Sequence, residues 1–183
     1  MDTTFDRTYW YLKSLTKDET DYKKLLTICH NIIFKIGNKL YIFYGDGNNG
    51  KSTLINILKR ILGVSVSVIP MSIPDQPEEC SLINKKLYII EELEDYRYMP
   101  KGFIKTVLSK SPMVTKDNDV IKTFISDANI LMHSNNDPSM VVADPGLHSY
   151  TIPFKFTQNM SESITEIPTP EEFYDFINSQ SNL

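Results

Sequence analysis

The sequence has few cysteines, few arginines and no long hydrophobic run. Its two cysteines, Cys29 and Cys80, are too few for a disulfide framework, so we expect reduced thiols in an intracellular protein. The three histidines, His30, His133 and His148, lack cysteine or carboxylate partners at metal-ligand spacing. No apolar run approaches the ~18 residues of a membrane helix, and the N-terminus lacks a signal peptide's apolar stretch. The sequence therefore predicts no disulfide scaffold, no histidine metal site and no membrane association.

Charge is unevenly distributed along the chain. The formal net charge is −4, but residues 160–183 carry −5, so the rest of the chain sums to +1. Only three arginines are present, Arg7, Arg60 and Arg97. A stand-alone nucleic-acid-binding protein would show a strong basic excess. Any DNA contact must therefore come from a few local lysines.

Residues 45–53, Gly-Asp-Gly-Asn-Asn-Gly-Lys-Ser-Thr, match the phosphate-binding motif G-x-x-x-x-G-K-[ST] at every required position. An apolar run at 40–44 precedes them and a helix-like segment at 54–62 follows, which is the strand–loop–helix setting that the motif requires. Glycines let such a loop turn its N–H groups inward, and a helix N-terminus attracts anions. A simple turn between strand and helix is the alternative, but a turn does not need Lys-Ser at the helix start. The motif predicts binding of a nucleoside triphosphate.

Each position of this loop has a predicted role. We expect Lys51 to neutralise the β- and γ-phosphates and to act in catalysis, and the Ser52 hydroxyl to bind Mg²⁺. ATP and Mg²⁺ are the predicted cofactors. The predicted nucleotide-binding residues are Gly45, Asp46, Gly47, Asn48, Asn49, Gly50, Lys51, Ser52 and Thr53.

Strand and helix patterns alternate through the middle of the chain, which predicts an α/β fold with a central, mostly parallel sheet flanked by helices. We expect an N-terminal helical segment at 1–38, a nucleotide-binding core at 39–159 and an acidic tail with a short helix at 160–183. The expected strands are 40–44, 64–69, 87–90, 128–132 and 150–156, the expected core helices are 54–62 and 102–110, and 113–124 is expected to be a β-hairpin.

Two capping boxes predict helix starts outside the core. Thr16 and Glu19 are expected to open a helix that ends at Gly37-Asn38. Thr169-Pro170-Glu171-Glu172 adds a proline at the first helical position. The tail helix is expected to bury Phe173, Tyr174 and Ile177.

Three expected strands carry polar residues at their carboxyl ends, where ligands bind in parallel sheets. These are the phosphate loop, Glu91-Glu92 and Asn135. We expect Glu91 to hold Mg²⁺ through water and Glu92 to act as the general base on the attacking water. Asn135 is expected to hydrogen-bond the γ-phosphate or that water. The alternatives are a solvated strand end for the two glutamates and a turn residue for Asn135.

The expected hairpin carries Lys116 and Lys122. Lysine neutralises nucleic-acid phosphates regardless of sequence. From the residues alone, a solvated hairpin tip is the favoured alternative to DNA binding.

Taken together, these motifs resemble the superfamily 3 helicases, especially the helicase domain of poxvirus-type and phage or plasmid primase–helicases. The resemblance rests on the loop at 45–53 and on Lys-Lys-Leu-Tyr-Ile-Ile-Glu-Glu-Leu at 85–93. It continues through 104–124, which is similar to the family's third motif and hairpin, Asn-Asn-Asp-Pro at 135–138, and Ile-Pro-Phe at 152–154.

The resemblance implies an AAA+-like P-loop NTPase that forms a homo-hexameric ring with ATP sites between subunits. It implies that the hairpin points into the central channel, where Lys116 would grip single-stranded DNA. Primase and other replication proteins are the implied further partners, and a viral origin would place the protein in the host cytoplasm or nucleus.

Two departures from the family pattern bear on activity. Ser109-Lys110-Ser111-Pro112 and Lys116 stand where the family has Gly-Gly-Asp and an arginine. Gly146-Leu147-His148-Ser149 stands where the family has an arginine pair, and no arginine follows Arg97. An arginine finger contributes about 10³–10⁵ in rate. We therefore predict weak hydrolysis by this chain alone.

The leading hypothesis is an ATP-dependent DNA helicase core that couples ATP hydrolysis to translocation on single-stranded DNA in viral or mobile-element replication. The alternative is a degenerate relative that binds ATP and acts as an interaction or assembly subunit without productive unwinding. A small-molecule kinase is disfavoured, because such enzymes carry several arginines for a second phosphate and a lid.

Overall fold

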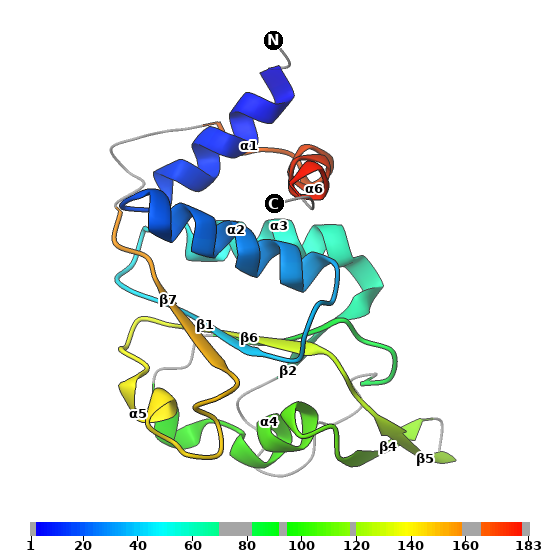
Figure 1. The fold of residues 1–183 in the computed structure, drawn as a ribbon. Helices are drawn as coiled ribbons and strands as arrows, with labels where there is room; N and C mark the ends of the chain where they lie inside the picture. The colour runs from blue at the N-terminus through cyan, green and yellow to red at the C-terminus, as the bar shows by residue number, and fades with distance from the viewer. Residues whose placement is uncertain (1–2, 70–81, 92–94, 118–119, 159–165, 181–183) are drawn as a thin grey trace.

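The computed structural model describes residues 3–69, 82–91, 95–117, 120–158 and 166–180 (Figure 1). The helices are α1 (Thr3–Ser14), α2 (Glu19–Ile33), α3 (Lys51–Leu62), α4 (Lys101–Leu108), α5 (Ser139–Val142) and α6 (Pro170–Ser179), with 3₁₀ turns η1 (Gly63–Ser65) and η2 (Tyr96–Tyr98). The strands are β1 (Leu40–Tyr44), β2 (Val66–Ile69), β3 (Leu87–Ile90), β4 (Pro112–Asp117), β5 (Val120–Ile125), β6 (Asn129–Ser134) and β7 (Thr151–Lys155).

Five strands form a sheet in the order β2-β3-β6-β1-β7, and every neighbouring pair is parallel. The central strand β6 is buried along its whole length, as expected for a parallel sheet covered on both faces. The predicted α/β fold with a central parallel sheet is confirmed. Because the strands are parallel, their carboxyl ends meet at one edge of the sheet and their amino ends at the opposite edge.

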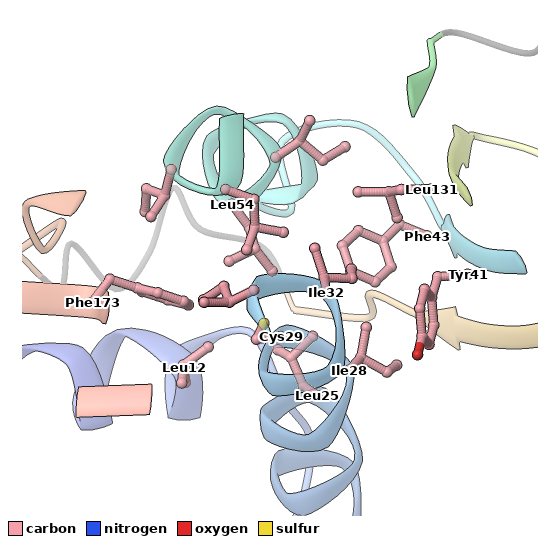
Figure 2. Close-up of a cluster of buried hydrophobic side chains, with 14 of the residues drawn as sticks. Leu12, Leu25, Ile28, Cys29, Ile32, Tyr41, Phe43, Leu54, Leu131 and Phe173 are labelled. Carbon is pink, nitrogen blue, oxygen red and sulfur yellow. The ribbon is translucent and has the colours of Figure 1, made fainter. Parts of the chain in front are cut away.

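Helices cover both faces of the sheet (Figure 1). Alternate residues of β1 illustrate the division: Tyr41 and Phe43 join the cluster under α1, α2, α3 and α6, whereas Leu40 and Ile42 join the cluster over α4. Figure 2 shows the first cluster, in which Phe173 of α6 packs with residues from the N-terminal helices. The N-terminal segment and the acidic tail therefore share one core with the sheet.

Helix α2 forms as predicted, but both of its predicted ends are wrong. The N-cap of α2 is Asp18, which accepts from the Asp21 N–H at 2.9 Å. The Thr16 hydroxyl instead donates to the Lys13 carbonyl at 3.0 Å, at the end of α1. The C-cap of α2 is Phe34, so the helix ends before Gly37-Asn38. The Asn38 amide is used elsewhere, because it donates to two carbonyls at the end of α4 at 3.0 Å each.

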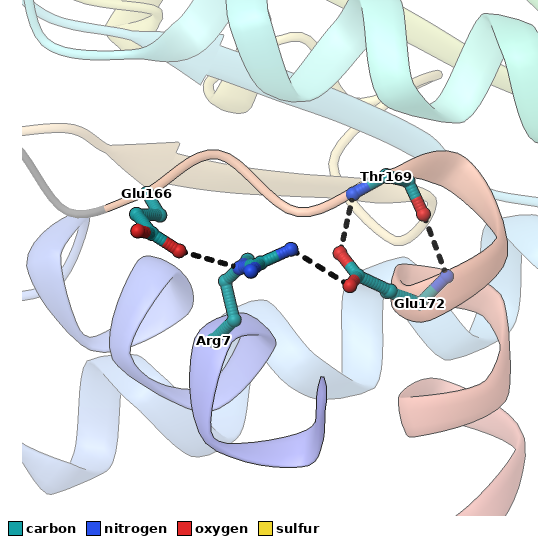
Figure 3. Close-up of polar contacts among 4 residues, drawn as sticks. All are labelled: Arg7, Glu166, Thr169 and Glu172. Atoms are coloured by element: carbon teal, nitrogen blue, oxygen red, sulfur yellow. Dashed lines mark hydrogen bonds and ion pairs between the residues drawn. The ribbon is translucent and has the colours of Figure 1, made fainter. Parts of the chain in front are cut away.

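The predicted capping box of the tail helix is confirmed (Figure 3). The Thr169 hydroxyl accepts from the Glu172 N–H at 3.2 Å, and the Glu172 carboxylate accepts from the Thr169 N–H at 2.8 Å. Arg7 of α1 bridges this box to the preceding segment by donating to Glu172 and to Glu166 at 2.8 Å each. Tyr174 is 39% exposed, so its predicted burial is wrong, and Phe176 takes the buried position beside Phe173.

The predicted hairpin is confirmed as an antiparallel pair, β4 and β5, which projects from the main sheet at the lower right of Figure 1. Met113 and Phe124, paired across its base, attach it to the second core cluster. Cys80 lies outside the described residues. Among the described residues, no helix is both long and apolar enough to cross a membrane.

Candidate functional site

The loop between β1 and α3 has the backbone conformation that its glycines allow. Gly45 has φ +127°, and a Cβ there would lie 2.3 Å from the Phe156 carbonyl oxygen. Gly50, the residue before α3, has φ +83°, and Asn48 has φ +58°. These left-handed values favour glycine and asparagine. The motif glycines at 45 and 50 are therefore required by the path of the chain.

Lys51 is folded back into its own loop. Its ammonium donates to the Gly45 carbonyl at 2.6 Å, to the Asp46 carbonyl at 2.8 Å and to the Asn49 side-chain oxygen at 3.1 Å. The residue is only 5% exposed. Burial lowers the pKa of the Lys51 ammonium, and the nearby Asp46 charge partly opposes that shift. The loop thus holds a largely desolvated cation whose partners are mainly neutral oxygens.

Asn49 links the loop to the end of β7. Its amide nitrogen donates to the Phe156 carbonyl at 3.4 Å, while its oxygen accepts from the Lys51 ammonium. The Phe156 N–H in turn donates to the Tyr44 carbonyl at 2.8 Å, at the end of β1. The chain after β7 therefore forms one wall of the phosphate loop.

A pocket of about 620 Å³ opens at the carboxyl edge of the sheet. This volume lies in the usual range for small-molecule sites. The pocket brings together the start of α3 and the end of β6, so Lys51, Ser52 and Asn135 line the same space. The described lining residues are Gly47, Asn48, Asn49, Gly50, Lys51, Ser52, Thr53, His133, Ser134, Asn135 and Asn136.

The structure describes only one of the two predicted acidic residues. Glu91 follows β3 at the same edge, but its carboxylate is ion-paired with the Lys59 ammonium of α3. Glu91 is not among the described residues that line the pocket. Glu92 lies outside the described residues. Within the described part of the chain, no group of three histidine, cysteine or carboxylate side chains is arranged to hold a metal ion.

The predicted DNA-binding lysines lie on the hairpin, away from the pocket. Lys122 is exposed on β5. The backbone of Lys116 pairs with Ile121 across the hairpin, whereas its side chain lies outside the described part of the structure. The turn at 146–149, where superfamily 3 helicases are expected to carry an arginine pair, leads into β7 at the amino edge of the sheet.

The sequence patterns missed two residues of the pocket wall, His133 and Ser134, and the contact of Tyr96 behind the wall. The Tyr96 hydroxyl donates to the Asn136 carbonyl at 2.9 Å, and burial raises the pKa of that phenol. The signal that would have found them is strand order. Once β6 is known to lie beside β1, Ser134 falls opposite Tyr44, next to the phosphate loop.

Comparisons with known proteins identify a family and a fold. A family model described as a family of unknown function, DUF5906, matches residues 43–147, more than half of the chain. No curated protein matches the sequence.

Solved structures with this fold include helicase domains. The apo structure of the NrS-1 C-terminal region (305–718) aligns with a TM-score of 0.67 at 17% identity, covering 98% of this chain and 44% of that one. A JCV helicase with a bound small molecule aligns with a TM-score of 0.60 at 12% identity, covering 95% of this chain and 53% of that one. This chain therefore spans about half the length of these neighbours, and the likeness is one of fold.

Proposed function

We propose that this chain, which belongs to the family of unknown function DUF5906, is the ATP-hydrolysing core of a DNA helicase of the superfamily 3 type. The observation that carries the proposal is the pocket in which the buried Lys51 ammonium, the start of α3 and Asn135 converge. The helicase-like fold of the structural neighbours supports it.

The donors of the pocket fit a triphosphate. The N-terminus of α3 attracts anions, as helix N-termini do in general. The Lys51 ammonium has neutral oxygens as its hydrogen-bond partners, so an anionic phosphate would give it a directly bonded counter-charge. The tight backbone at Gly45 keeps this cradle close to the end of β7. We infer that residues 45–53 bind the phosphates of ATP.

The remaining roles follow from the sequence motifs. Ser52 lines the pocket, and its hydroxyl would ligate Mg²⁺. Glu91 would contribute through water only after leaving its ion pair with Lys59. When bound, Mg²⁺ would act as the Lewis acid that polarises the phosphoanhydride bond of ATP. Glu92 takes a proton from the attacking water, and Asn135 orients that water or the γ-phosphate.

The resemblance extends the proposal to the assembly. The chain would act as a homo-hexamer with ATP sites between subunits, with Lys116 and Lys122 of the hairpin contacting single-stranded DNA. Primase or other replication proteins are proposed partners. The second candidate function, an ATP-binding subunit without productive unwinding, is favoured by one observation: the turn at 146–149 contains no arginine. A neighbouring subunit of the same sequence therefore supplies no guanidinium from this turn.

The test begins with nucleotide binding. Lys51→Ala removes charge-assisted hydrogen bonds to the phosphates and should weaken binding of a fluorescent ATP analogue by about 10–100-fold. Lys23→Ala, an exposed lysine of α2, is the matched control and should bind like the wild type. Thermal unfolding of both variants verifies that they fold. Unchanged affinity in the Lys51 variant would rule out both candidate functions.

Turnover and assembly then separate the two candidates. ATP hydrolysis is measured with and without single-stranded DNA, alongside the mass of the assembly. A hexamer that hydrolyses ATP faster when DNA is added supports the helicase core. Its turnover should still be slow, because the turn at 146–149 supplies no arginine finger. An ATP-binding monomer supports the assembly subunit. Turnover of several per second by the chain alone would contradict the prediction of weak hydrolysis.

A further inference from the structure

Lysines gather at the amino edge of the sheet, opposite the pocket. The segments that lead into the five parallel strands, together with the link from α4 to β4, carry a net charge of +3 among the described residues, whereas the whole chain carries −4. Two carboxylates lie among them, and one of these, Asp144, faces Lys101 and Lys105 of α4 at 3.7 and 3.3 Å. We call five lysines of these segments the basic edge: Lys35, Lys39, Lys85, Lys86 and Lys110.

Contacts across the edge show that lysines from different segments lie together. Lys35, after α2, is 2.5 Å from the Asp127 carboxylate, before β6. The Lys35 hydrogen bond holds the pKa of Asp127 below its usual range, and the charge of Lys110 acts in the same direction. Asp127 thus pairs with Lys35, and the charge of Lys110, far away in sequence, also acts on it. One carboxylate and two ammonium groups leave this cluster positive.

Two further lysines extend the positive charge along the edge. Lys39 precedes β1 and Lys86 precedes β3, and β6 separates these strands. Two strand spacings amount to roughly 10 Å. Lys86 and Lys110 are exposed. The hairpin starts at Pro112, directly after this edge, so the charge is continuous with the hairpin base.

The chemistry of the basic edge favours a phosphate backbone over an acidic protein. Lysine is depleted at protein–protein interfaces, whereas it neutralises nucleic-acid phosphates without regard to sequence. The chain's own acidic tail is also committed elsewhere, because Glu166 and Glu172 pair with Arg7. Those two carboxylates therefore do not neutralise the basic edge within the same chain.

We propose that the basic edge binds the phosphate backbone of a nucleic-acid strand, at a site separate from the nucleotide pocket and from the tip of the hairpin. The contact is electrostatic and independent of base sequence. The strand would lie across the amino ends of β1 and β3 and reach the base of the hairpin. Because these lysines lie at the opposite edge from Lys51, the binding does not require ATP hydrolysis.

The test uses the exposed pair, because Lys86 and Lys110 can be changed with little effect on folding. The double variant Lys86→Gln/Lys110→Gln is compared with Lys17→Gln/Lys23→Gln, which removes the same charge from exposed positions at the start of α2. Fluorescence anisotropy measures binding of a dye-labelled oligothymidine of about 20 nucleotides over a range of salt concentrations. A duplex of the same length shows whether the edge prefers one or two strands.

Each phosphate contact on a single strand contributes a slope of about 0.7 in log affinity against log salt. The basic-edge variant should therefore lose about 1.4 of slope and bind about 25-fold more weakly near 0.1 M salt. The α2 variant should match the wild type. Equal affinity and slope in both variants would overturn the proposal. Loss of binding to polyglutamate, with oligothymidine binding unchanged, would also overturn it in favour of an acidic polypeptide.

Nucleotide binding, measured in the same variants, separates this inference from the proposed function. Both lysine pairs lie outside the pocket, so both double variants should bind the fluorescent ATP analogue as tightly as the wild type. One outcome would separate the two proposals: neither the wild type nor any variant binds ATP, but the basic-edge variant still loses DNA affinity. The proposed function would then be wrong, and the nucleic-acid site on the basic edge would be supported.

Discussion

Gly45→Ala should strongly destabilise the protein, even though it adds a single methyl group. Gly45 has φ +127°, which a residue with a Cβ rarely adopts. The new Cβ would lie 2.3 Å from the Phe156 carbonyl oxygen, whereas real contacts of this kind stay above 3.0 Å. The Phe156 carbonyl must therefore move, and it also accepts the hydrogen bond from Asn49.

The expected magnitude combines two costs. A non-glycine residue in a sparsely populated backbone region costs about 1–3 kcal/mol. Forcing an extra carbon into a packed site costs about 1–3 kcal/mol more. The free energy of unfolding should therefore fall by about 2–6 kcal/mol, out of a total of about 5–15 kcal/mol for a typical domain.

Urea denaturation followed by circular dichroism measures the change. With a slope of about 2 kcal/mol per molar urea, the midpoint should fall by about 1–3 M. Gly47→Ala is the matched control, because its φ is not positive and no atom lies within 4 Å of the added carbon. It should change stability by less than about 0.5 kcal/mol. If Gly45→Ala unfolds at the same urea concentration as Gly47→Ala, the reasoning from the backbone is wrong.

Three further predictions concern helices α2 and α6 and their contacts on one face of the sheet. Phe173→Ala should cost about 3–5 kcal/mol in unfolding free energy, because the ring is fully buried. Tyr174→Ala should cost less than about 1 kcal/mol, because that side chain is partly exposed. Equal effects would contradict the docking of α6. The backbone N–H of the α6 cap, followed by the Arg7 guanidinium, lowers the pKa of Glu172. The ionised Glu172 carboxylate therefore stabilises the fold fully above the ordinary glutamate pKa of about 4.3, and this stabilisation is lost as pH falls through the lower pKa of the folded state. The difference in unfolding free energy between the wild type and Glu172→Gln should therefore disappear in acid. A difference that does not change with pH would refute this assignment. Burial raises the pKa of the Cys29 thiol, so in a Cys80→Ser background a thiol reagent should label Cys29 only as fast as the protein unfolds, and immediate labelling of the folded protein would count against a sealed core.

Local sequence patterns predicted the elements that depend on nearby residues. The phosphate loop sits between a strand and a helix because its glycines, its apolar run and its Lys-Ser pair all act within about a dozen residues. The capping box at Thr169 is equally local, since each side chain bonds a backbone group three residues away. Prediction failed where two local patterns competed. Thr16 and Asp18 both suit a helix cap, and the end of α1 engages the Thr16 hydroxyl.

By itself, the sequence determined the fold class, the position of the phosphate loop and the shortage of arginine, because each of these follows from residue type and short spacing. Only the tertiary structure decided which strands are neighbours. Placing β6 beside β1 brings Asn135, His133 and Ser134 to the pocket wall, whereas Glu91 is paired with Lys59. These contacts join segments tens of residues apart, and their formation depends on how the buried faces of the helices and strands fit together. No local periodicity encodes that fit.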